Sequence, residues 1–168
     1  SPRPTVGMAF QNPVLLEWRS ILQNVLLPLE IVKSGMSKAQ GLERAHYLLE
    51  LVGLKGFEDK RPSELSGGMR QRASLCRSII HKPDVLILDE PTRGVDVGAK
   101  REIQAIIRDC VAKGVGVVLI SSEFEEIVEG ADRIIVLNEG RIVTELTNPG
   151  ITEDALVRAL AHTEGKAA

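Results

Sequence analysis

An unbroken apolar run that ends in two carboxylates constrains the fold of this chain more than any other feature. Residues 85–88 read Val-Leu-Ile-Leu, the length of a strand, and Asp89 and Glu90 follow directly. A run without alternation is typical of a strand buried on both faces, as in parallel sheets covered by helices. A second such run, at 115–120, follows a helical pattern at 97–112. The order strand, helix, strand predicts an α/β fold with a parallel sheet and crossover helices.

The rest of the chain is predicted to be helical before this strand and mixed after it. The expected elements are a strand at 5–10, a loop at 11–16, helices at 19–33, 37–52, 68–81, 123–129 and 152–161, and a hairpin of 133–137 with 141–146. Pro28 is expected to kink or break its helix. Ser37 and Gln40 have the spacing of a capping box. We expect the acids of 123–129 on a solvated face and His81 at the surface.

Composition narrows the class of protein. With 168 residues, 43% of them hydrophobic, the chain has the size and apolar content of one globular domain. Its 21 basic and 23 acidic residues give a net charge of −2, which argues against a nucleic acid partner. Cys76 and Cys110 lack the spacing of a disulfide framework, so we expect reduced thiols. No apolar stretch reaches the roughly 18 residues of a membrane helix, so any membrane role comes through a partner.

Asp89 and Glu90 stand where open α/β sheets place their ligands, at the carboxyl end of a strand. Two solvated acids, or acids that cap the next helix, are the alternative interpretation. The residues that follow, Pro91-Thr92 and the turn at 94–96, favour a functional role. An Asp that holds Mg²⁺ beside a Glu that activates water is a suitable pair for phosphoryl transfer.

Ser66, Gly67 and Gly68 stand at the predicted start of a helix. Backbone N–H groups, a hydroxyl and the positive end of the helix dipole together favour an anion, and glycines let a phosphate approach the main chain. An N-cap with a flexible turn is the alternative. The Asp-Glu-Pro-Thr sequence further along the chain favours the anion site.

Taken together, these motifs resemble the ATP-binding cassette (ABC) family, the ATPase subunits of ABC transporters. Residues 65–71 are similar to the signature LSGGxxQ, residues 85–90 to the Walker B strand with its catalytic Glu, and residues 94–96 to the D-loop. Gln11 matches the Q-loop glutamine, which in the family approaches Mg²⁺ and faces the membrane subunit. The resemblance implies a P-loop NTPase-like, mostly parallel sheet with an inserted α-helical subdomain.

The resemblance also divides the chain into functional segments and assigns roles to residues. Residues 1–11 correspond to a strand and the start of the Q-loop, 12–82 to the helical signature subdomain, 83–150 to the Walker B, D-loop and switch part of the catalytic core, and 151–168 to a C-terminal helix and tail. The implied site residues are Glu90, Gln11 and Asp96 for catalysis, Asp89 and Gln11 for Mg²⁺, largely through water, and Ser66, Gly67, Gly68 and Gln71 for ATP bound on a partner cassette.

Two departures from the family pattern stand out. Ser122 occupies the position of the switch histidine, and a serine does not replace imidazole as a contact to the γ-phosphate. The phosphate loop G-x-x-x-x-G-K-[ST], expected before Gln11, does not occur in the sequence. We therefore expect this sequence to lack the Walker A strand and an antiparallel layer. That strand lies between 115–120 and 133–137 in the family fold, so we also expect two unpaired strand edges.

The implied function is ATP hydrolysis coupled to solute import. Residues 11–19 resemble importers of nitrate or sulfonate, whereas 92–100 and 121–123 resemble sugar importers. The implied partners are a second ABC ATPase subunit and transmembrane permease subunits, at the cytoplasmic face of the membrane. Without Walker A, the isolated chain is expected to be inactive. A half-site that does not hydrolyse ATP, or an inert fragment, remains an alternative, and a soluble ABC ATPase of DNA repair or translation is a third.

Overall fold

The computed structural model describes residues 6–32 and 34–164, which form two compact units divided between Ile120 and Ser121. The first unit contains β1 (Val6–Ala9), α1 (Ile21–Ile31), α2 (Lys38–Leu51), a 3-10 turn η1 (Pro62–Glu64), α3 (Gly67–Ile79), β2 (Val85–Asp89), α4 (Val97–Ala112) and β3 (Gly116–Ile120). The second contains α5 (Phe124–Gly130), β4 (Arg133–Asn138), β5 (Arg141–Thr147) and α6 (Glu153–Glu164). The functional segments that the resemblance implies stay a prediction.

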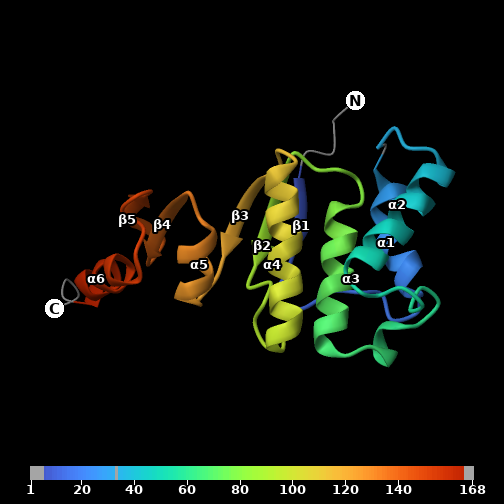
Figure 1. The fold of residues 1–168 in the computed structure, drawn as a ribbon, viewed down its shortest axis with the longest axis horizontal. Helices are drawn as coiled ribbons and strands as arrows, with labels where there is room; N and C mark the ends of the chain where they lie inside the picture. Colours follow the sequence, from blue (N-terminus) through green and yellow to red (C-terminus); the bar gives the residue numbers. More distant parts are fainter. Residues whose placement is uncertain (1–5, 33, 165–168) are drawn as a thin grey trace. The chain divides into compact units, whose positions relative to one another are not determined.

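The first unit is built on a parallel sheet in the order β1-β2-β3. Ala9 pairs with Leu88, and Asp89 pairs with Ile120, so the three strands end at the same level. The prediction of a parallel α/β sheet is confirmed. Figure 1 shows that the carboxyl ends of these strands and the N-termini of α3 and α4 lie at the same end of the unit.

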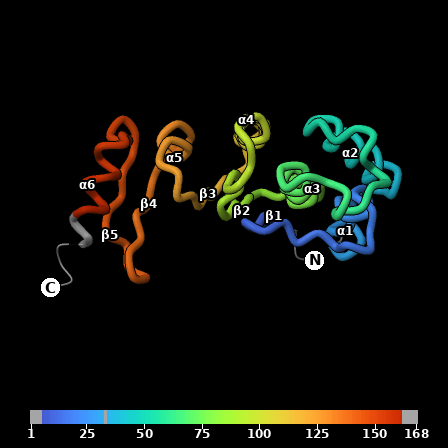
Figure 2. Tube along the Cα trace, turned by 90° about the horizontal axis from the view of Figure 1, so that it is seen from below, coloured from blue at the N-terminus to red at the C-terminus, as the bar shows by residue number. Residues whose placement is uncertain are grey.

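Helices cover one face of this sheet. Leu86 and Leu88 are 0% exposed beneath α3 and α4, which lie on the same side of β1 and β2 in Figure 2. On the opposite face Met8 is 43%, Val118 50% and Ile120 50% exposed. The expectation of burial on both faces is therefore wrong for the described residues. Both crossovers advance in one direction across the sheet, and right-handed connections then place every helix on the same face.

Local sequence signals explain how the helices begin, and one of them misled. Ser37 and Gln40 form the predicted capping box, and Ser20 with Gln23 forms a second one at the start of α1. Pro28 lies inside α1, which continues to Ile31, so of the predicted kink or break the break does not occur. A proline removes a single backbone hydrogen bond, and the tertiary packing of α1 retains the helix around it.

The second unit is a hairpin packed against α5 and α6. β4 and β5 pair antiparallel as predicted, and Glu139 and Gly140 turn the chain with positive φ angles, as two-residue hairpin loops do. Glu125 and Glu129 are exposed, as expected, whereas Glu126 is buried and accepts a hydrogen bond from Ser121, which corrects the expectation for this acid. In the described residues, β3 pairs only with β2 and β4 only with β5, which agrees with the two expected unpaired edges.

Arg44 joins two helices of the first unit by closing the end of α3. Its Nε donates to the Ile80 carbonyl at 2.8 Å and its Nη2 donates to the Ile79 carbonyl at 2.9 Å. The last carbonyls of a helix have no partner within the helix, so a cationic donor there satisfies them and complements the helix dipole. Partial burial lowers the pKa of Arg44 from its ordinary value. Arg44 thereby fixes α2 against the carboxyl end of α3.

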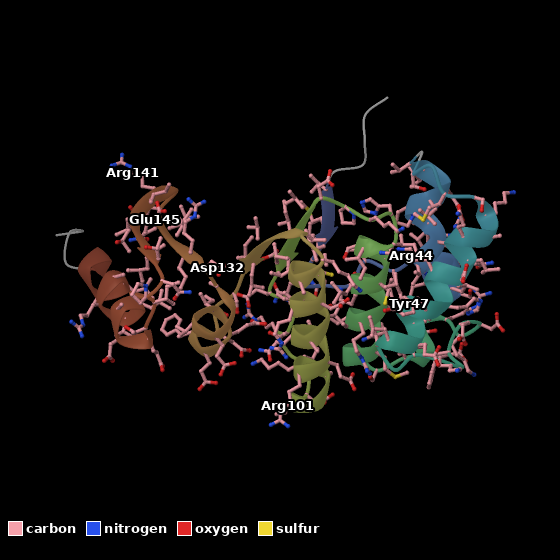
Figure 3. All side chains as sticks on the ribbon, turned by 45° about the horizontal axis from the view of Figure 1, so that its top comes forward. Arg44, Tyr47, Arg101, Asp132, Arg141 and Glu145 are labelled. Carbon is pink, nitrogen blue, oxygen red and sulfur yellow. The ribbon has the colours of Figure 1, made fainter. Side chains whose placement is uncertain are left out.

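We expect Arg44→Ala to lower the free energy of unfolding by about 2 kcal/mol, because two carbonyls near the core lose their donor. Urea unfolding followed by far-UV circular dichroism measures this effect. Arg101→Ala is the matched control, since Arg101 extends from α4 away from the neighbouring helices (Figure 3), and a change within about 0.5 kcal/mol is expected there. Equal effects of the two substitutions would contradict the role of Arg44.

His81 is buried, which corrects the expectation that it lies at the surface. Its Nε2 lies 3.2 Å from the Val6 carbonyl, while its Nδ1 has no partner among the described residues. Burial lowers the pKa of His81, and the nearby Arg44 adds to this effect. The folded state therefore holds His81 neutral.

This burial predicts a stability that depends on pH. The unfolded chain takes up the proton near the ordinary pKa of 6.5, so the contribution of His81 is complete above that pH and is lost as the pH falls through the lowered folded-state value. His81→Gln replaces the ring N–H donor by an amide N–H donor, and the glutamine side chain does not titrate. We expect its melting temperature to fall less than that of the wild type between about pH 7.5 and about pH 5.5. Parallel curves for the two proteins would exclude His81 as the source.

Candidate functional site

Asp89 and Glu90 lie at the carboxyl end of the central strand. Asp89 is the last residue of β2 and is half-buried. Glu90 has a φ of 47°, and its N–H donates to the Ile120 carbonyl at 2.8 Å. A left-handed conformation is strained for a residue with a side chain, and such strain concentrates at functional sites. The backbone conformation and the bond to Ile120 fix the position of Glu90 directly after β2.

Ser66 caps α3 as predicted. Its hydroxyl accepts a hydrogen bond from the Met69 N–H at 3.2 Å. A Cβ added to Gly67 would meet no atom within 4 Å, so the first turn of the helix is open on that side. The first N–H groups of a helix have no partner within it, and an anion satisfies them. The geometry of the turn is therefore suited to phosphate.

The N-terminus of α4 lies against this turn. Asp96 caps α4, accepting the Ala99 N–H at 3.0 Å, and this hydrogen bond lowers the pKa of Asp96. A Cβ added to Gly68 would lie 3.1 Å from the Ala99 Cβ and 3.6 Å from Asp96 Oδ2. The structure therefore brings the predicted signature residues and Asp96 together, with two helix N-termini side by side.

Gln11 follows β1 and is exposed, next to the end of β2 in the parallel register. Gln71 does not lie on the surface of the signature turn. It is 5% exposed, and its Nε2 donates to the Phe10 carbonyl at 3.3 Å. Ser122 lies in the second unit, and its role as the switch residue stays a prediction.

Two arginines of α3 that the sequence did not single out hold the signature helix in place. Arg72 donates to the Val52 carbonyl at 2.8 Å and forms an ion pair with Glu102 of α4. Arg77 donates to the Val14 carbonyl. Both arginines read as ordinary helix-surface residues in the sequence, because their acceptors are main-chain atoms distant along the chain. Only the tertiary structure identifies them.

The donor set at this end of the sheet fits Mg²⁺. The carboxylate of Asp89 and the amide oxygen of Gln11 belong to segments that leave adjacent parallel strands. Mg²⁺ is usually held by one or two protein oxygens together with waters and substrate phosphates, so a dedicated cage is not required. The described residues contain no group of three or more His, Cys, Asp or Glu side chains suited to a metal.

Comparison with known proteins decides the family. The family model described as ABC transporter matches residues 1–93, more than half of the chain. The chain belongs to the ABC transporter family. Its fold is that of the ABC cassette: it matches the ATP-binding cassette MJ0796, solved as a dimer in a post-hydrolysis state bound to ADP and Pi. That match has a TM-score of 0.78 at 28% identity and covers 88% of this chain and 65% of that one.

The curated relatives of this ABC protein include import ATP-binding proteins. It is 42% identical over 144 residues to the methionine import ATP-binding protein MetN of Rhizobium etli, which covers 85% of this chain and 39% of the relative. It is 39% identical over 152 residues to the ribose import ATP-binding protein RbsA 2 of Mesorhizobium japonicum, covering 88% and 30%. The chain thus spans two fifths or less of the length of these relatives. Within the described residues, no helix is long and apolar enough to cross a membrane.

The contact at Gly68 predicts different effects of two neighbouring substitutions. Gly68→Ala places a methyl group 3.1 Å from the Ala99 Cβ, so the contact between α3 and α4 must give by a few tenths of an ångström, which we expect to cost about 1–2 kcal/mol of stability. Gly67→Ala meets no atom within 4 Å, so we expect a neutral or slightly stabilising effect from the better helix former. Urea unfolding of both variants tests the contact. Equal losses would show that α3 and α4 do not meet at Gly68.

Proposed function

We propose that this protein is an ATP-binding, ATP-hydrolysing subunit of an ABC importer, or a part of one. The observation that carries the proposal is the contact of the turn at Ser66–Gly68 with Asp96, at the same end of the sheet as the strained Glu90. Membership of the ABC family supports ATP as the ligand. The import ATP-binding relatives support transport as the purpose.

In the proposed reaction, Glu90 acts on the attacking water, and the turn at Ser66–Gly68 binds phosphate. The carboxylate of Glu90 accepts a hydrogen bond from the attacking water and orients it, with assistance to its deprotonation. The Ser66 hydroxyl and the N–H groups of Gly67 and Gly68 donate to the γ-phosphate of ATP held on a second cassette. Asp96, in the D-loop, lies against the same turn and, with Gln11, is suited to couple the two ATP sites.

Asp89 and Gln11 would hold Mg²⁺, largely through water, at the ends of β2 and β1. When bound with the nucleotide, the ion neutralises charge on the phosphates. The half-buried position of Asp89 supports this role, because a carboxylate removed from bulk water attracts a cation more strongly. Gln11 contributes a neutral oxygen on an exposed segment that is free of strand pairing.

A second cassette and permease subunits are the proposed partners, at the cytoplasmic face of the membrane. Three apolar residues around Gln11 are exposed, Phe10 by 47%, Val14 by 59% and Trp18 by 70%. Apolar residues gathered on one exposed segment are typical of an interaction surface. They support a protein partner beside Gln11, as the family role of this glutamine implies.

Replacement of Glu90 tests the proposal. In the full-length parent protein assembled with its partner cassette, we expect Glu90→Gln to retain binding of MgATP and to lower kcat by at least about a hundredfold, because the amide is a poor base for the attacking water. Steady-state phosphate release and equilibrium nucleotide binding measure the two effects separately.

Glu139→Gln is the matched control, since Glu139 has the same φ of 47° but lies in the β4–β5 turn. Unchanged turnover in Glu90→Gln would refute the catalytic assignment. If the wild type binds no nucleotide itself but restores turnover to an intact partner cassette, the half-site alternative holds in place of the hydrolysing subunit.

A further inference from the structure

Two side chains of α3 hold the main chain on both sides of Gln11. Gln71 donates to the Phe10 carbonyl at 3.3 Å, directly before Gln11, and Arg77 donates to the Val14 carbonyl after it. Past β1 this segment has left the sheet, and its local backbone bond from the Leu15 N–H to the Pro13 carbonyl does not tie it to another element. Further along, Asn24 of α1 bonds to both the N–H and the carbonyl of Leu16. The path of the chain directly on either side of Gln11 is therefore set by α3, and from Leu16 on it is set by α1.

The hydrogen bond from Gln71 to the Phe10 carbonyl is costly to break. Its side chain is 5% exposed, and a buried amide donor without an acceptor is costly, so the Phe10 carbonyl must follow Gln71 when α3 moves. The same burial leaves this amide N–H engaged with the protein rather than with a nucleotide. The Phe10 carbonyl belongs to the peptide bond that leads into Gln11, so the bond orients that peptide plane.

The opposite end of the link is the signature turn. Gln71 lies about one helical turn after Gly67 on the same helix, and the intervening turn begins at the Ser66 cap. Arg72 braces this part of α3 on both sides, through the Val52 carbonyl and Glu102. A small shift of the turn that grips phosphate is thereby passed to the Phe10–Gln11 peptide by one rigid turn of helix.

We infer that Gln71 is a positioning residue, which couples the phosphate-binding turn of α3 to the placement of Gln11 instead of contacting ATP. The inference rests on the proposed function for the role of that turn and of Gln11. The hydrogen bond itself and its mechanical consequence do not depend on nucleotide chemistry. The two parts are therefore tested separately.

Hydrogen exchange in the full chain tests the mechanical part. Gln71→Met retains the size of the side chain and removes the donor, and Gln104→Met on α4 is the matched control. In Gln71→Met we expect the Leu15 amide, whose hydrogen bond to the Pro13 carbonyl is local to the segment 11–16, to exchange about tenfold faster, with exchange in β2 and α4 unchanged. The control is expected to match the wild type. Unchanged exchange at the Leu15 amide, or an equal increase throughout the first unit, would overturn the inference.

Turnover in the protein assembled with its partner cassette tests the coupling. We expect Gln71→Met to lower kcat about tenfold with an unchanged KM for MgATP, whereas loss of a direct ATP contact would raise KM. A raised KM with unchanged kcat would overturn the positioning role. A wild type without ATPase activity would refute the proposed function and leave the exchange result standing. Gln71→Glu serves if Gln71→Met does not fold, and failure of both to fold would overturn the inference in favour of a purely structural role.

Discussion

The parallel register of β1, β2 and β3 is the constraint on which the candidate site depends. Leu88 pairs with Ala9, and Ile120 pairs with Asp89, so the residues after three separate strands emerge at one edge. Burial of Leu86 and Leu88 under the helices holds this register, since a slip of one residue would expose them and turn Asp89 toward the core. The packing of Leu86 and Leu88 thus brings Gln11, Asp89 and Glu90 to one edge, although none of these three polar residues belongs to the apolar core.

α3 is the second organising element, because polar side chains connect it to α2, to α4 and to the segment after β1. Arg44 of α2 satisfies the carbonyls at its end, Arg72 joins it to α4, and Gln71 and Arg77 hold the segment after β1. Most of these bonds end on main-chain carbonyls, whose positions do not vary with the side chains that surround them. A displacement of α3, and of the signature turn at its start, is therefore coupled to displacements of α2, α4 and the segment after β1.

The elements could be predicted from the sequence where the signal was local, and the tertiary features could not. The capping box of Ser37 and the hairpin turn at Glu139 depend on a few adjacent residues, and both were predicted. The burial of His81 depends on Val6, which is distant along the chain. Motif spacing similarly located Asp89, Glu90 and the turn at Ser66, whereas the contact of Gly68 with Ala99 required the packing of α3 on α4.

The conformation of Glu90 shows how the fold reconciles a buried strand with a charged end. Alternation along β2 would assign residue 90 to the same face as Leu86 and Leu88, where a carboxylate would lose its water at high cost. The strand instead ends at Asp89, and Glu90 retains its pairing to Ile120 through the backbone while φ becomes positive. The strained turn thus continues the sheet hydrogen bonding by one residue and takes the carboxylate out of the strand alternation. A catalytic acid at this position would gain fixed placement from the sheet while avoiding burial in the core.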